Sequence, residues 1–161
     1  MKNRMKRMAL LVALCMTTML TVYAQGSAKV EEKVNAMVEK YDGVEDVTCV
    51  TLVKGRGLEM VKMMFYKEFG KDFMKGVKSI TIIEYSDATP ATCQAIHEDL
   101  DGFLALLEEF NVGNEKQFAD NDYIRSFAKP SGTKTLSDFV IALEDKESKM
   151  IMYMAGEIKV E

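Results

Sequence analysis

Residues 136–155, LSDFVIALEDKESKMIMYMA, decide the fold, because two apolar runs of strand length flank a short charged turn. The runs cover 136–144 and 150–155, and the polar residues between them suit a tight connection. A third run, 123–129, precedes them across a Pro-Ser-Gly turn. The sequence therefore predicts three strands that form an antiparallel meander.

Upstream of these strands, helical and strand patterns alternate along the chain. Apolar residues at a 3.6-residue period predict helices over 30–41 and 58–69, and residues 89–90 (Thr-Pro) supply an N-cap and a first residue for a third helix. Two runs rich in β-branched residues, 47–53 (VTCVTLV) and 77–85 (VKSITIIEY), are apolar on both faces. We expect both of these strands to be buried.

The order of these elements, α-β-α-β-α-β-β-β, predicts a single α+β domain over residues 25–161. Each strand–helix–strand connection implies parallel neighbouring strands with a right-handed crossover, and the last three strands add antiparallel pairs. We therefore expect a mixed five-stranded sheet with about three helices packed mainly on one face. Residues 111–122 form a long polar connector between the third helix and the meander.

Residues 1–24 have the pattern of a signal peptide. A basic segment without acids precedes the apolar stretch 8–22, and Ala24 ends a small-residue pattern that favours cleavage before Gln25. A retained membrane anchor is the alternative, but about fifteen apolar residues are short of the ~20 that span a bilayer. The residue before Cys15 is a leucine, which does not fit a lipid-attachment site. We expect an exported product, periplasmic or secreted, with no membrane span after cleavage.

The charge of the chain argues against polyanionic partners. It carries 21 Lys and Arg residues against 25 Asp and Glu residues, a net charge of −4. Four basic residues and no acids lie in 1–24, so the processed chain has 17 basic residues against 25 acidic ones, a net charge of −8. Like-charge repulsion disfavours nucleic acid and anionic lipid headgroups as partners.

The single histidine, His97, lies on the predicted third helix beside Glu98, Asp99 and Asp101. It is off the apolar stripe of that helix, and no nucleophile is near it along the chain. A solvated position on the helix surface is therefore favoured over a catalytic base. The usual zinc-ligand spacings are absent as well. We expect no catalytic residue, no metal ligand and no cofactor.

Cys49 and Cys93 are the two cysteines of the processed chain. Cys49 is central in the predicted strand 47–53, and Cys93 lies on the helix stripe that faces the sheet, so both side chains can point into the same layer. Export to an oxidising compartment makes a disulfide between them feasible. The alternative is two separate buried thiols that pack as small apolar side chains.

Methionines gather in two places, three on one face of the last strand and three on the second helix: Met150, Met152 and Met154, and Met60, Met63 and Met64. Thioethers are soft ligands that bind Cu(I), which raises copper handling as a function. Packing between the sheet and the helices is the favoured interpretation, because methionine fills irregular gaps in a core.

The connector 111–122 is the longest irregular segment, and Phe118 is an aromatic residue among polar neighbours within it. Recognition often uses irregular segments that a packed scaffold holds, so Phe118 is a candidate contact for a partner. The alternative, which we favour slightly, is that Phe118 folds back to cover the end of the sheet.

The stretches 77–87 (VKSITIIEYSD) and 135–161 (TLSDFVIALEDKESKMIMYMAGEIKVE) resemble the family called domain of unknown function 4252. The resemblance covers most of residues 28–160 and includes the terminal Gly-Glu-Ile at 156–158. Members of this family are small exported proteins of Bacteroidetes, and many look like lipoproteins, from which this chain departs. The resemblance implies a location in the cell envelope, and it implies no assigned activity or catalytic motif.

Export, a compact core and the missing catalytic constellation favour a non-enzymatic binding or interaction module of the bacterial cell envelope. Its partner would be an envelope protein or a small ligand. An exported hydrolase that uses scattered carboxylates and a methionine-based copper-handling protein are the alternatives. A pocket with converging acids would favour the enzyme, whereas a flat sheet face or an exposed apolar groove would favour binding.

Export predicts a defined N-terminus. The mature product is expected to begin at Gln25 and to be released by osmotic shock, or recovered from the medium, without detergent. Mass spectrometry of the purified native protein checks this directly. An intact segment from Met1, or a lipid on Cys15, would contradict the prediction.

Overall fold

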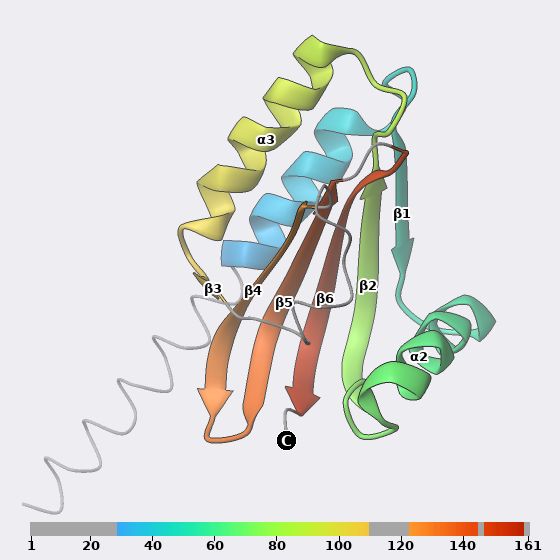
Figure 1. Cartoon of the computed structure of the whole chain (residues 1–161), viewed down its shortest axis with the longest axis vertical. Helices are drawn as coiled ribbons and strands as arrows, with labels where there is room; N and C mark the ends of the chain where they lie inside the picture. Colours follow the sequence, from blue (N-terminus) through green and yellow to red (C-terminus); the bar gives the residue numbers. More distant parts are fainter. Residues whose placement is uncertain (1–28, 110–122, 145–146, 160–161) are drawn as a thin grey trace, which may run out of the picture.

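The computed structural model describes residues 29–109, 123–144 and 147–159 (Figure 1). A first helix covers 29–41 and is followed by β1 (Thr48–Leu52), α2 (Arg56–Phe69), β2 (Gly76–Glu84), α3 (Pro90–Leu104), β3 (Glu108–Glu109), β4 (Tyr123–Gly132), β5 (Thr135–Glu144) and β6 (Lys149–Lys159). The α+β class is therefore as expected, and the helices and longer strands lie close to their predicted positions.

The strands form one sheet of six, in the order β1-β2-β6-β5-β4-β3. Every neighbouring pair is antiparallel. The expectation of a mixed five-stranded sheet with parallel crossovers is therefore wrong. The predicted meander is correct for β4, β5 and β6, and β6 then pairs with β2 in the centre of the sheet.

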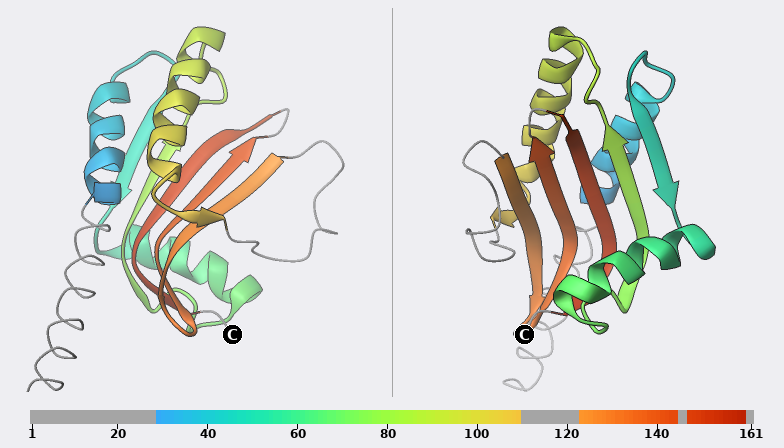
Figure 2. Two further views of the ribbon diagram at one scale, coloured as in Figure 1. Left: turned by 90° about the vertical axis from the view of Figure 1, so that its left-hand side faces the viewer. Right: turned by 45° about the vertical axis from the view of Figure 1, so that its right-hand side comes forward.

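The error in strand direction has a physical cause in the placement of α2. This helix lies across one end of the sheet, so the chain leaves β1 and re-enters β2 at the same end (Figures 1 and 2). The two strands then pair antiparallel, with Thr48 opposite Glu84 and Leu52 opposite Ile80. A right-handed parallel crossover needs a helix that carries the chain back along the sheet. The sixth strand, β3, has only two residues, too few to produce a periodic pattern.

The helices cover the two faces of the sheet unequally. The helix 29–41 and α3 lie side by side on one face, and α2 packs against the other (Figure 2). The first face holds an aromatic-rich cluster: Val34, Met37, Ile96, Phe103, Tyr85 and Tyr153 are among its buried members. The second face holds Leu58, Met74, Ile80, Phe139, Met154 and Ile158. Two of the three helices share a face, and the sheet separates two cores.

Local signals in the sequence set the helix ends. The Thr89 side chain accepts a hydrogen bond from the Thr92 backbone N–H at 3.2 Å, and Pro90 begins α3, as predicted. Gly70 ends α2 with φ of +84°, a conformation that favours glycine.

The expectation that 47–53 is buried on both faces is wrong, because β1 is an edge strand and its Val50 is exposed.

A pair of hydrogen bonds ties the helix 29–41 to α3. Lys40 Nζ and Tyr41 Oη both donate to Asp99 Oδ2, each at 2.7 Å. Partial burial of Asp99 acts to raise the pKa of its carboxyl group, but these two hydrogen bonds outweigh that effect and lower it. The carboxylate is therefore charged at neutral pH and holds the two helices in register over the sheet.

The sheet bends at one level along β6 (Figure 2). Register shifts interrupt both of its pairings there, between Val77 and Ser79 of β2 and between Ser137 and Phe139 of β5. Gly156 of β6 lies at this level with φ of +117°. Bulges bend a strand and increase its twist, so β2 and β5, the two neighbours of β6, bend at the same level.

A buried carboxylate occupies the bulge of β5. Asp138 has φ of +52° and is almost inaccessible to solvent. Its oxygens accept hydrogen bonds from Tyr153 Oη at 2.8 Å and Ser137 Oγ at 3.4 Å. Burial, with the nearby carboxylate, raises the pKa of the Tyr153 hydroxyl far above its ordinary value, so this group stays a donor. The hydrogen bond from Tyr153 to Asp138 links the bulge of β5 to β6.

The bend predicts opposite effects for two Gly→Ala substitutions. A Cβ on Gly156 would overlap the carbonyl oxygen of Gly76 and lie 3.1 Å from the Cα of Val77. Gly156→Ala is therefore expected to lower the free energy of unfolding by about 2–4 kcal/mol. A Cβ on Gly102, inside α3, meets nothing within 4 Å, so Gly102→Ala should raise it by up to ~1 kcal/mol. Chemical denaturation measures both, and equal values for the two variants would contradict the bend as described.

Candidate functional site

A cavity of about 480 Å³ lies between α3 and the sheet face that it covers. Three elements and the end of a fourth contribute its walls: His97, Leu100 and Asp101 come from α3, Arg125 from β4, Ala142 and Glu144 from β5, and Tyr85 follows β2. These residues are distant in the sequence, and the cavity joins two carboxylates, a guanidinium, an imidazole and a phenol.

The regular periods of helix and strand place these side chains. His97, Leu100 and Asp101 are three and four residues apart, so they share one face of α3. Ala142 and Glu144 alternate along β5 and point to one face of the sheet, and Arg125 of β4 is paired with Ala142. The cavity lies where the two sets face each other.

Tyr85, Glu144 and His97 form a hydrogen-bonded group at one side of the cavity. Tyr85 is fully buried, and its hydroxyl donates to Glu144 Oε1 at 3.0 Å. His97 Nε2 contacts the same carboxylate oxygen and lies 3.4 Å from the Tyr85 hydroxyl. The Tyr85 hydroxyl donates its hydrogen bond to Glu144. An ionised carboxylate only accepts hydrogen bonds, so the imidazole Nε2 must carry a proton to donate to it. The Nδ1 atom then accepts in the neutral ring and donates in the charged ring.

Electrostatics keep Tyr85 a donor. Burial, followed by the charge of Glu144 and its hydrogen bond, raises the pKa of the Tyr85 hydroxyl far above its ordinary value. The ring of Tyr85 meets that of His97 edge to face, with centroids 5.9 Å apart. The buried phenol therefore fixes both the carboxylate and the imidazole, whose side chains remain 29% and 41% exposed.

Arg125 supplies the positive charge of the cavity wall. Its Nε lies 3.5 Å from Glu109 Oε1, and its guanidinium carbon lies 4.5 Å from the centroid of the Phe127 ring. An ion pair and a cation–π contact hold the arginine in place over β4. Two carboxylates, Asp101 and Glu144, line the same cavity, so both signs of charge face it.

The lining combines charged and polar groups with two apolar side chains. Among its described residues, none is Ser, Thr or Cys. In the described part of the chain, no three His, Cys, Asp or Glu side chains converge as metal ligands. The arrangement can bind a polar molecule through charged hydrogen bonds, and its His97–Glu144 pair can move a proton.

Reasoning from the sequence missed this site. His97 is partly solvated as expected, but it also contacts Glu144, which lies 47 residues away in the chain. No local pattern reports such a tertiary contact. The available signal was Tyr85, a polar aromatic residue at the end of an apolar strand, which needs a hydrogen-bond partner when buried.

Both cysteines lie on the side of the sheet that the helix 29–41 and α3 cover. Cys49 is half-buried against the cluster to which the buried Cys93 belongs, and both thiols are free in the structure. The Cys93 thiol donates to the Ala88 carbonyl oxygen at 3.5 Å, and Lys149 Nζ donates to Cys93 Sγ at 3.5 Å. The two residues share a layer as expected, and the disulfide stays a prediction.

The two methionine groups differ in burial. Met152 and Met154 are buried and Met150 is half-buried, packed against the core on the α2 side of the sheet. The methionines of α2 are all exposed: Met60, Met63 and Met64. The packing interpretation is therefore correct for β6 and wrong for α2.

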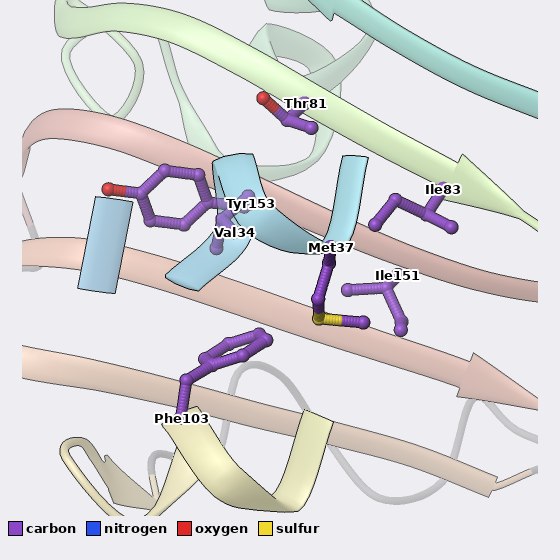
Figure 3. Close-up of a pocket in the computed structure, with 7 residues that line it drawn as sticks. All are labelled: Val34, Met37, Thr81, Ile83, Phe103, Ile151 and Tyr153. Carbon is purple, nitrogen blue, oxygen red and sulfur yellow. The ribbon is translucent and has the colours of Figure 1, made fainter. Parts of the chain in front are cut away.

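Three points remain from the search for sites. Phe118 and the connector 111–122 lie outside the described residues. A gap between the helix 29–41, α3 and the sheet is lined by Val34, Met37, Thr81, Ile83, Phe103, Ile151 and Tyr153, and it has no room for a water molecule (Figure 3). It is a packing defect of the core. Within the described ranges, no helix has the length and apolar character that crossing a bilayer requires.

Comparison of the chain with protein-family models, with curated proteins and with solved structures finds no match. The resemblance to domain of unknown function 4252 therefore stays a prediction. The function has to be inferred from the geometry.

The burial of the β6 methionines predicts that they pack and do not bind metal. Replacing Met150, Met152 and Met154 together by leucine should keep the fold, at a cost below ~1.5 kcal/mol for each change. Thermal unfolding and a Cu(I) titration of wild type and variant measure both points. Tight Cu(I) binding that the triple variant loses would contradict this assignment.

Proposed function

We propose that the protein is a non-enzymatic binding module of the bacterial cell envelope that holds a small polar ligand in the cavity beneath α3. The observation that carries this proposal is the convergence of Tyr85, His97, Arg125 and Glu144 on one cavity of about 480 Å³. Small-molecule sites have volumes of roughly 300–1,000 Å³ and combine apolar walls with a few placed polar groups. Burial of Tyr85 preorganises those groups before a ligand binds.

The charges of the lining favour a ligand that carries both a cation and an anion. An arginine such as Arg125 can bind a carboxylate through two parallel hydrogen bonds, while Glu144 and Asp101 attract an ammonium group. Leu100 and Ala142 offer apolar surface between these charges. A zwitterionic amino acid or short peptide has this distribution of groups.

A hydrolase is the second candidate, and the His97–Glu144 contact is the observation that favours it. A carboxylate that orients an imidazole can hold the ring in position to take a proton from a water molecule. Arg125 could then stabilise negative charge that develops on a substrate. Because the described lining has no Ser, Thr or Cys, we propose direct attack by water as the reaction of such an enzyme.

The binding proposal predicts that Glu144→Gln weakens a ligand that wild type binds. A panel of amino acids and dipeptides is screened by the shift that each causes in Tm, and binders are measured by calorimetry. Loss of a charged hydrogen bond, worth about 1.5–3 kcal/mol, should raise Kd at least about tenfold. His97→Gln should have a similar effect.

The matched control is Gln94→Ala, on the same helix but outside the cavity lining. It should bind as wild type does. A panel in which no compound raises Tm, or a binder whose Kd is the same in all variants, would contradict the proposal. Turnover of an ester or peptide that His97→Gln abolishes while binding persists would favour the hydrolase instead.

A further inference from the structure

The outer surface of α2 is apolar where a surface helix is ordinarily polar. Met60, Met63 and Met64 are 63%, 55% and 70% exposed. They are three and four residues apart, so they form one continuous stripe on the helix. Val53, just before the helix, is exposed as well. The inner side of α2 already has its own contacts with the sheet through Leu58, so the stripe is a second apolar face of one helix.

Basic residues outnumber acidic ones around this stripe in a chain that is otherwise acidic, although Glu59 is exposed beside Met60 and pairs with the buried Lys62. Residues 54–78 contain seven Lys or Arg residues and three Asp or Glu residues, a net charge of +4, whereas the whole chain carries −4. Lys54 and Arg56 are exposed at the start of α2, and Lys71 and Lys75 are exposed in the turn that follows it. Arg56 lies one helical turn before Met60, on the same face.

The apolar stripe with basic residues at both ends of α2 is the arrangement of an amphipathic helix that lies in a membrane interface. Flexible apolar side chains enter the boundary between headgroups and acyl chains, while lysine and arginine remain among the phosphates. Charge complementarity therefore selects an anionic bilayer as the partner. We propose that α2 docks the protein peripherally on an anionic lipid surface through the α2 methionine stripe, defined as Met60, Met63 and Met64, and its flanking basic residues.

This inference changes the conclusion drawn from total charge. The net charge of the chain averages a basic segment with an acidic remainder, and exposed charges interact over a Debye length of only ~10 Å at 0.1 M salt. An anionic surface that meets α2 is therefore attracted by the local charge. Docking by one helix lays the protein on the membrane and does not cross it.

Vesicle binding tests the proposal directly. Vesicles of phosphatidylglycerol and phosphatidylcholine in equal parts, and of phosphatidylcholine alone, are sedimented with the protein. Wild type is expected to bind the anionic vesicles, to bind neutral ones much less, and to be released at about 1 M salt, where the Debye length is ~3 Å. The variant Lys54→Glu with Arg56→Glu should lose at least about 25-fold in partitioning, about fivefold for each basic residue. Carboxylates at a helix N-terminus favour the helix, so this variant is expected to fold.

Two further variants separate the apolar and the electrostatic contributions. Met60→Ser with Met63→Ser and Met64→Ser keeps the charge and should lower partitioning about tenfold or more. Lys29→Glu with Lys33→Glu changes the net charge by the same amount as the α2 pair, on exposed positions of the helix at the other face, and should bind as wild type does. All comparisons are between variants of the same chain, so residues 1–28 contribute equally to each.

Three outcomes would overturn the proposal. Wild type could bind neutral and anionic vesicles equally, or the Lys54→Glu, Arg56→Glu variant could bind as the Lys29→Glu, Lys33→Glu control does. Ultracentrifugation could also show that wild type forms dimers that the methionine variant does not form, with no vesicle binding. That last result would make the α2 methionine stripe an interface between two copies of the chain.

Discussion

The backbone of β6 approaches β2 so closely at Gly156 that no side chain fits between them. This contact allows the register of β6 to shift against β2 and against β5 at one level, and the sheet bends there. The buried Asp138 and its bond to Tyr153 fix the neighbouring bulge. Each face of the bent sheet has its own core, because the helix 29–41 and α3 pack on one face and α2 packs on the other. The positions of the helices, and with them the candidate cavity, depend on this difference between the two faces of the sheet.

The candidate cavity lies on the face of the sheet that α3 covers. Strand alternation sends Glu144 and Ala142 toward the face covered by α3, while Ile141, the residue before Ala142, points to the other core. Tyr85 continues the β2 ladder, its N–H donating to the Lys149 carbonyl at 2.9 Å, so its ring lies inside and its hydroxyl reaches the polar group. The buried phenol finds its acceptor in Glu144, the carboxylate at the end of β5, and His97 of α3 contacts the same carboxylate oxygen.

The sequence predicts what local physics determines. The Thr89 cap, the Pro90 start of α3 and the strand runs all follow from residue types within a few positions, and the structure contains them. Strand direction, the two-residue β3 and the exposure of β1 depend on where distant elements pack, which apolar patterns do not encode. The same distinction holds at the site: Tyr85 and Glu144 are 59 residues apart, so only the fold reveals their contact. The methionines illustrate it most clearly, since identical side chains are buried on β6 and exposed on α2.

The two proposed contact regions are separated both in space and in charge. β2 begins just after the turn that follows α2 and runs nine residues to Tyr85, which at ~3.3 Å per residue places the cavity about 30 Å from the α2 end of that strand. The regions also lie on opposite faces, because the cavity is beneath α3 and α2 packs on the other side. Residues 54–78 carry +4, so the remaining residues from 25 onward carry −12. Such a charge distribution orients the molecule at an anionic surface with α2 toward it, since the acidic remainder is repelled. In that orientation the cavity faces away from the lipid, and a ligand reaches it from the aqueous side.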